Sequence, residues 1–209
     1  MGSSELPEVH SKNSGWEIRT KGTAGGFTHL LSQNARSPLS DVELVWDWSV
    51  GRFPNPVGAS PSDKEADDYA LRVGILIRGD GEVKLPDSLK EAVLNLGGKV
   101  SYVVFYSATN KKDWAGKCLP NPYSERVINC FRLARKTFSQ VRAFPLTDLE
   151  SVIPLKSEAS TRLESIGLWV FADSDNSKSE SRAHLQHLKI GARELTVSLA
   201  VRPSHPENP

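Results

Sequence analysis

Two stretches of the sequence alternate apolar and polar residues with a period of two, and this pattern constrains the fold more than any other feature. Residues 41–50 read DVELVWDWSV, and residues 67–78 read DDYALRVGILIR. Successive side chains of a β-strand point to opposite faces of its sheet. Each stretch is therefore predicted to be a strand with one face in a core, and the polar face of 41–50 is expected to line solvent or a cleft. The apolar face of that stretch comprises Val42, Leu44, Trp46, Trp48 and Val50.

Shorter segments rich in β-branched and aromatic residues complete the pattern. Helices are expected only at 84–96 and 147–164, the second broken at Pro154. Many short strands with so few helices favour a mainly β, antiparallel two-sheet sandwich of jelly-roll type over repeated βαβ units. A single domain is expected over 15–202, with disordered segments at 1–14 and 203–209. The further strands are expected at 15–20, 26–33, 99–107, 126–133, 166–172, 183–190 and 194–201.

The composition excludes several classes of partner. A formal net charge of +1 gives no field that would attract nucleic acid or a membrane surface. No window approaches the roughly 18 to 20 apolar residues that span a bilayer, so no membrane insertion is expected.

The two cysteines, Cys118 and Cys130, are too few for a disulfide scaffold and are either bridged or two free thiols. Residues 1–15 have neither a basic start nor an apolar segment, so no secretory signal is expected within them.

The segment 166–176, IGLWVFADSDN, joins an unbroken apolar run to a cluster of oxygen-bearing side chains. A buried strand is predicted to deliver Asp173, Asp175 and Asn176 to a surface loop, and carboxylate and amide oxygens are the ligands that Ca²⁺ prefers. We therefore predict a structural calcium at these three residues. The spacing differs from a helix-loop-helix calcium loop, because Lys178 replaces the expected glycine. The alternative is that these side chains cap the turn themselves.

Asp68 and Arg72 share one face of the strand predicted over 67–78 but lie about 13 Å apart along it, so each needs another partner. A buried arginine needs carboxylates, and Asp173 or Asp175 from a neighbouring strand end would serve. Two interpretations stay open. These residues, together with Asp67, form either a ligand site or an ion-pair network that fixes the register of the strands.

A proline-flanked turn at 120–123 is expected to aim Asn121, Tyr123 and Arg126 at a shared cleft, where an aromatic ring and a guanidinium suit sugar or carboxylate recognition. Tyr123 could equally cover the end of the core. Trp114, in a loop, is the best candidate for an exposed stacking platform, whereas Trp46 and Trp48 are expected in the core. The predicted ligand-binding residues are Asp68, Arg72, Trp114, Asn121, Tyr123 and Arg126.

The sequence lacks the common catalytic signatures: it has no Gly-x-Ser-x-Gly elbow, no phosphate-cradling glycine-rich loop and no His-Glu-x-x-His. His184 and His187 are three residues apart, and in a strand this spacing sends them to opposite faces, which argues against a shared metal. Convergence of Asp68, Asp173 and Asp175 within a few ångströms would allow glycoside chemistry, but the sequence does not give that distance.

Four motifs, VWDWSV, ADDYALRVGILI, PNPYSERV and LWVFADSDNS, occur in an order and at spacings that resemble the bacterial domain-of-unknown-function family 3047, over about 15–190. Members of that family typically carry an export signal and have no assigned activity. The resemblance thus implies a periplasmic or secreted β-sandwich-like protein and no particular reaction. At 184–188 the chain reads HLQHL where the family has Tyr-Gly-Asp, so any role of that tyrosine or aspartate does not transfer.

Three functional hypotheses follow. The first is a non-catalytic binding module for a carbohydrate or another polar ligand of the cell envelope, with the structural calcium. The second is a hydrolase or lyase, which requires its polar side chains to converge in one open cleft. The third is a structural or protein-interaction domain, which requires a large exposed apolar patch. The oligomeric state is open. The second hypothesis uses Asp68, Arg72, Tyr123, Arg126 and Asp175.

Overall fold

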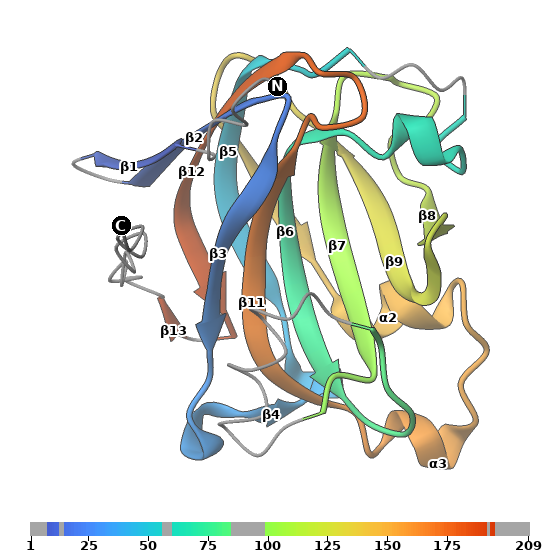
Figure 1. Cartoon of the computed structure of the whole chain (residues 1–209). Coiled ribbons are helices and arrows are strands. Elements are labelled where there is room, and N and C mark those ends of the chain that lie inside the picture. Colours follow the sequence, from blue (N-terminus) through green and yellow to red (C-terminus); the bar gives the residue numbers. More distant parts are fainter. Residues whose placement is uncertain (1–7, 13–14, 56–59, 85–98, 192, 195–209) are drawn as a thin grey trace, which may run out of the picture.

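The computed structural model describes residues 8–12, 15–55, 60–84, 99–191 and 193–194. Two β-sheets pack face to face, and the described part of the chain adds only two short α-helices (Figure 1). The predicted mainly β, two-sheet sandwich is therefore confirmed. One strand pair departs from the antiparallel expectation, since β7 and β9 run parallel, while the other described pairs are antiparallel.

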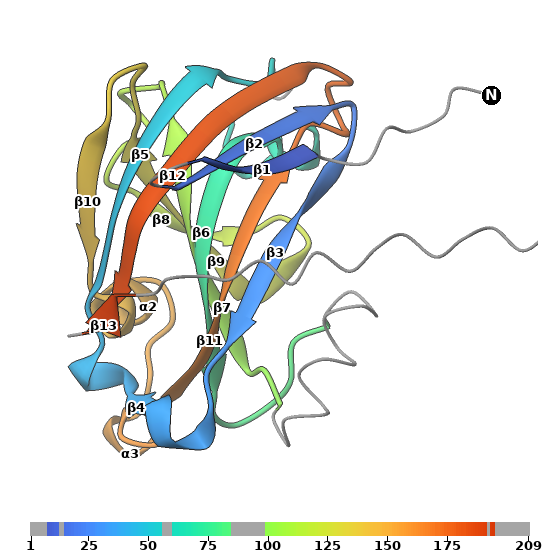
Figure 2. The same ribbon diagram turned by 90° about the vertical axis from the view of Figure 1, so that its left-hand side faces the viewer.

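The first sheet has the strand order β1-β2-β12-β5-β10, and β13 also pairs with β12. Figure 2 shows this sheet facing the viewer. Strands distant in sequence become neighbours here: β12 lies between β2 and β5, with Ala183 opposite both Ile18 and Val50. The strands are β1 (Glu8–Lys12), β2 (Gly15–Lys21), β5 (Leu44–Arg52), β10 (Ser139–Ala143), β12 (Glu180–Ile190) and β13 (Arg193–Glu194).

The second sheet has the order β3-β11-β6-β7-β9-β8, and β4 also pairs with β11. Its central strands are the apolar ones that the sequence singles out, because β11, β6 and β7 are covered on both faces. The strands are β3 (Ala24–Leu30), β4 (Ser37–Pro38), β6 (Tyr69–Arg78), β7 (Tyr102–Thr109), β8 (Cys118–Asn121), β9 (Ser124–Leu133) and β11 (Glu164–Asp173).

Short helical turns occupy the connections. The helices α2 (Pro145–Glu150) and α3 (Ser157–Ser160) lie on either side of Pro154, as the predicted break requires. The described residues also contain three 3-10 turns: η1 (Gln33–Ala35), η2 (Leu39–Asp41) and η3 (Lys64–Ala66). Within the described residues, no helix has the length and apolar character needed to cross a membrane.

Two sequence expectations differ from the structure, and three others lie wholly or mostly outside the described residues. Residues 8–12, in the segment expected to be disordered, form β1 by pairing along β2. Cys118–Asn121, which overlaps the turn expected at 120–123, forms β8 because it pairs with β9. The helix expected at 84–96 lies outside the described residues except for its first residue, as do the tail at 203–209 and, after its first residue, the strand expected at 194–201.

The main core lies between the sheets and contains the two tryptophans of β5. Trp46 and Trp48 are fully buried, with ring centroids 5.4 Å apart, and Trp46 also lies 5.2 Å from the ring of Tyr106 on β7. Burying an aromatic side chain removes about 150–250 Å² from water, which stabilises the fold by roughly 4 to 6 kcal/mol per ring. The prediction that these two rings belong to the core is confirmed.

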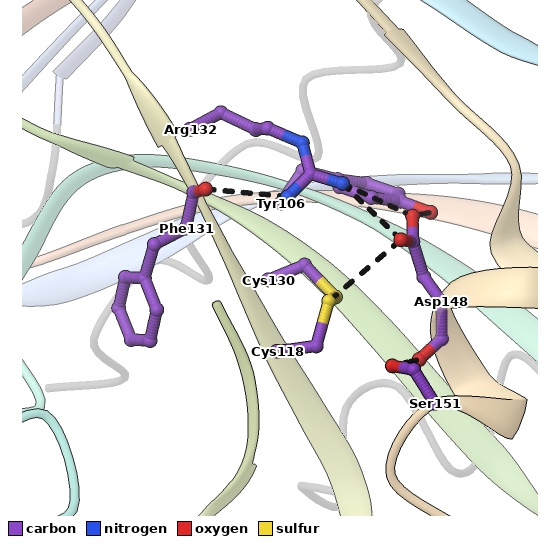
Figure 3. The surroundings of a disulfide bond; sticks show 7 residues. All are labelled: Tyr106, Cys118, Cys130, Phe131, Arg132, Asp148 and Ser151. Carbon is purple, nitrogen blue, oxygen red and sulfur yellow. Dashed lines mark hydrogen bonds and ion pairs between the residues drawn. A yellow bond between two sulfur atoms is a disulfide. The ribbon is translucent and has the colours of Figure 1, made fainter. Parts of the chain in front are cut away.

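A disulfide joins Cys118 and Cys130, which lie directly opposite each other on β8 and β9 (Figure 3). This settles the choice between a bridge and two free thiols. Beside the bridge, Asp148 of α2 accepts hydrogen bonds from the Tyr106 hydroxyl at 2.9 Å and from Nη2 of Arg132 at 3.2 Å. Burial, followed by this carboxylate, raises the pKa of Tyr106. These hydrogen bonds from Tyr106 and Arg132 hold α2 against the second sheet.

Candidate functional site

The first candidate site lies where β11 ends and β6 begins, at the upper end of the molecule in Figure 1. Asp173, the last residue of β11, is paired with Tyr69, the first residue of β6. This register brings the β11–β12 loop against the two aspartates that precede β6. The strand β11 leads directly into the loop that carries Asp175 and Asn176, as the sequence analysis expected. We call Asp67, Asp68, Arg72, Asp173, Asp175 and Asn176 the loop-end cluster.

Arg72 is the centre of this cluster and is 3% exposed. Its Nη1 lies 3.3 Å from Oδ1 of Asp67, and its Nη2 lies 3.4 Å from Oδ2 of Asp173. Nη2 also donates to the backbone carbonyl of Asp67 at 2.9 Å, and the guanidinium carbon lies 4.1 Å from the ring centroid of Tyr69. The carboxylate partner expected from the neighbouring strand end is therefore Asp173.

Asp68 holds the β11–β12 loop in place. Its two carboxylate oxygens accept hydrogen bonds from the backbone amides of Asn176, at 3.2 Å, and Ser177, at 2.7 Å. Asp173 likewise accepts from the amide of Asp175 at 3.2 Å, which is a side-chain-capped turn. Lys178 has a φ of 52° at the position where a calcium loop has glycine. These are the contacts of the turn-capping alternative.

The cluster still brings carboxylates close enough for a cation. Oxygens of Asp68, Asp173 and Asp175 all lie within 4.8 Å of one another. Burial raises the pKa of Asp173 to about 7, against the opposing effect of the Arg72 guanidinium. Oxygens of Asp68 and Asp173 already accept hydrogen bonds, and Arg72 supplies positive charge, so the fit to a divalent cation is poor. Calcium at Asp173, Asp175 and Asn176 stays a prediction.

The turn after β8 joins the cluster only in part. Asn121 donates from Nδ2 to Oδ1 of Asp67 at 3.0 Å and accepts the amide of Tyr123 at 3.0 Å. The Tyr123 ring is 59% exposed. Arg126 instead donates to the carbonyl of Asp80 at 3.0 Å, and Asp80 follows the opposite end of β6. The predicted convergence of Arg126 with Asn121 and Tyr123 is wrong: the β8–β9 pairing shifts register between Pro120 and Asn121, and Arg126 contacts the chain just beyond the far end of β6.

Trp114 is not an exposed platform. It is 5% exposed, its ring lies 5.4 Å from that of Phe131, and Nζ of Lys111 lies 3.9 Å above it. Backbone hydrogen bonds from Gly116 to Phe131 and from Phe131 to Lys117 fold this loop onto β9. That folding buries the indole, so the prediction of its exposure is wrong.

The loop-end cluster does not meet the condition for a hydrolase or lyase. Asp68 and Arg72 are buried and engaged, and Arg126 lies elsewhere. The sequence analysis left two interpretations open, a ligand site and an ion-pair network that fixes strand register. The observed contacts fit the ion-pair network.

The second candidate site is a hollow of about 700 Å³ on the first sheet, which the sequence did not predict. We call it the sheet hollow. Residues of β2, β5 and β12 line it, most of them on the outer face of the sheet, together with the segment that leads into β10. Ser49 is among them, and it belongs to the polar face of 41–50, which was expected to line either solvent or a cleft. The lining residues used below are Lys21, Arg52, Lys136, Phe138, Arg182 and His184.

Glu17 lies beneath this hollow and is fully buried. Its Oε1 is 2.5 Å from Nε of Arg19 and 2.8 Å from Nε of Arg182, and its Oε2 is 3.9 Å from Nε2 of His184. Arg19 and Arg182 are directly opposite each other on β2 and β12. The shared carboxylate therefore holds two like charges side by side, which would otherwise repel.

The sequence signal for the hollow is visible only after the fold is known. The alternation in GWEIRTK puts Glu17, Arg19 and Lys21 on one strand face, but it does not say which strand lies beside it. The partner, β12, comes more than 150 residues later. The pairing of β2 with β12 brings charged side chains that are distant in sequence together in one site.

The fold and these sites define the protein as a two-sheet β-sandwich with a polar, mainly cationic hollow on one sheet. The chain belongs to the family described as protein of unknown function (DUF3047), whose model matches residues 7–189. This confirms the resemblance found in the sequence motifs. No curated protein matches the chain.

Among solved structures, the chain is similar to the xyloglucanase domain of NopAA, a type three effector from Sinorhizobium fredii, in complex with cellobiose. The identity is 10% and the TM-score 0.38, over 88% of this chain and 91% of that one. At this TM-score the likeness carries no conclusion about function.

Proposed function

We propose that this protein is a non-catalytic binding module that holds a carbohydrate or similar polar ligand in the sheet hollow. The observation that carries the proposal is the hollow itself: about 700 Å³, open on one sheet face and lined by charged side chains and hydroxyls. Ligand sites in proteins commonly enclose about 300 to 1,000 Å³ and combine a few polar groups with aromatic surface.

Phe138 supplies the aromatic surface. Phe138 is 50% exposed, and its ring makes an edge contact with His184, at 6.3 Å between centroids, on one side. An exposed aromatic ring beside hydrogen-bonding groups suits the apolar face and hydroxyl edges of a sugar.

The carboxylates of the hollow favour binding over catalysis. Glycoside hydrolysis needs one carboxyl group as an acid and a second as a nucleophile or base. Glu17 is engaged by Arg19 and Arg182, and Glu180 is engaged by Arg52. Neither carboxylate is free for that work.

The disulfide supports the periplasmic or secreted location that the family resemblance implies. Thiols are kept reduced in the cytosol of most organisms, so a bridge such as Cys118–Cys130 is typical of exported proteins. A ligand of the cell envelope would be found in the same compartment.

Two exposed aromatics provide a matched test. Phe138 lies at the sheet hollow, and Tyr123 lies beside the loop-end cluster, where the sequence placed the ligand. Wild type, Phe138→Ala and Tyr123→Ala are compared on a glycan array, and hits are confirmed by calorimetry. We expect a glycan that binds wild type and Tyr123→Ala but binds Phe138→Ala at least tenfold more weakly. The reverse ranking would move the site to the loop-end cluster, and no glycan bound by wild type would refute the proposal.

A further inference from the structure

We propose that the ligand of the sheet hollow is an acidic saccharide, whose carboxylate or sulfate groups lie against the cationic side chains of β2, β12 and the segment before β10. This inference rests on the proposed function and names its ligand class. It follows from the charge of the hollow, from hydrogen-bond donors there that can reach a ligand, and from the exposed ring of Phe138.

Charge is concentrated at the hollow. Five cationic side chains face two carboxylates there, Glu17 and Glu180, although the formal charge of the whole chain is only +1. Clustered charge of one sign in a concave surface raises the local concentration of counter-charged ligands. The five are Arg19, Lys21, Arg52, Lys136 and Arg182.

Several of these cationic side chains have N–H groups that can donate hydrogen bonds to a ligand. Arg19 and Arg182 both contact Glu17 through Nε, and within the described residues their terminal nitrogens have no hydrogen-bond partner. Their side chains are 46% and 47% exposed, so these nitrogens can reach an incoming anion. Lys21 and Lys136 are exposed and form no ion pair with other residues of the described chain.

Glu17 makes this arrangement possible. Two arginines placed opposite each other on neighbouring strands destabilise a sheet unless an anion lies between them. The buried carboxylate of Glu17 takes that position and orients both guanidinium groups. A fork of parallel N–H groups then remains for the planar carboxylate or sulfate of a ligand.

The size and the ring favour a saccharide over a simple ion. A hollow of about 700 Å³ is far larger than phosphate or sulfate requires, and Phe138 offers a sugar face a surface that an inorganic anion does not use. Single-stranded nucleic acid binds through several stacked bases, whereas Phe138 is the single exposed aromatic ring among the lining residues of the hollow.

The experiment is calorimetry on the full chain, and its first comparison varies the charge on one saccharide backbone. The first pair is trigalacturonic acid and its fully methyl-esterified form. A sulfated disaccharide, inorganic phosphate and a short single-stranded oligothymidylate separate the possible sources of negative charge. The variants are Lys21→Gln and Lys136→Gln, and Lys112→Gln, an exposed lysine outside the hollow, is the control.

We expect at least one of the two acidic saccharides to bind more than tenfold more tightly than the ester, and to weaken as NaCl rises from 50 to 500 mM. Lys21→Gln and Lys136→Gln should each weaken that binding about three- to tenfold, and Lys112→Gln should not change it. Equal binding of acid and ester would overturn this inference and leave the proposed function intact. Tighter binding of phosphate or the oligonucleotide would overturn the assignment of the ligand as a saccharide. No binding of either acidic saccharide would overturn this inference, while the glycan array decides the proposed function.

Discussion

The buried carboxyl of Asp173 gives the fold a pH dependence whose sign can be worked out. Burial raises its pKa from the ordinary 3.8 to about 7. Below pH 3.8 the folded and unfolded chains both hold the proton, and this carboxyl favours neither. As the pH rises from about 4 to 7, the unfolded chain ionises freely while the folded protein does not. The free energy of unfolding should therefore fall across this range and level off above it.

The magnitude follows from the same two values. A carboxyl whose pKa rises from 3.8 to about 7 on folding costs roughly 4 kcal/mol of stability once it is ionised. About 3 kcal/mol of this falls between pH 5 and pH 8, a range in which the protein can be handled. An asparagine at position 173 cannot ionise and should remove the effect.

The assay is urea unfolding of wild type and Asp173→Asn at intervals from pH 5 to 8. Histidine titration affects both proteins, so the difference between them isolates the carboxyl. The variant also loses the contact to Arg72 at 3.4 Å, which changes its free energy of unfolding. The contact of Arg72 to Asp67 remains and limits this change. Asp113→Asn, on an exposed turn, controls for the general loss of a carboxylate. A wild-type-minus-variant difference that stays flat with pH would refute the reasoning.

Three further predictions concern stability and metal. Replacing both cysteines by serine should lower the free energy of unfolding by about 3 kcal/mol, from the entropy of a loop of 12 residues, and an unchanged urea midpoint would show that the bridge contributes nothing. Trp114→Ala should cost about 3 to 5 kcal/mol in the same assay, because the indole is buried against Phe131; a loss below about 1 kcal/mol would mean that the ring is exposed. The calcium prediction requires EDTA to lower the melting temperature and added Ca²⁺ to restore it, with Asp175→Asn insensitive to both; no shift in wild type would exclude a structural calcium.

The strands were predictable because their signal is local. Alternation in residues 41–50 and the unbroken apolar run before Asp173 each report burial that a single strand imposes on its own side chains. The same strand argument predicted that Asp68 and Arg72 cannot pair and that Arg72 takes a carboxylate from a neighbouring strand end, either Asp173 or Asp175. The ion pair at 3.4 Å bears this out.

The remaining features depend on contacts between distant segments. Trp114 is buried because its loop pairs with β9, and Arg126 lies apart from Asn121 where the β8–β9 pairing shifts register. The sheet hollow needs β2 beside β12, a pairing that no local pattern encodes. Sequence periodicity gives the face on which a side chain lies, and only the strand order gives its neighbours.

The most direct test of the central claim is to locate the bound ligand by NMR. Amide resonances of the ¹⁵N-labelled protein are followed while an acidic oligosaccharide is added. If the sheet hollow is the ligand site, the resonances of Lys21, Ser49, Gly51 and Phe138 should shift in a saturable way, while those of Asp173, Asp175 and Tyr123 stay in place. Saturable shifts confined to the loop-end residues would contradict the account.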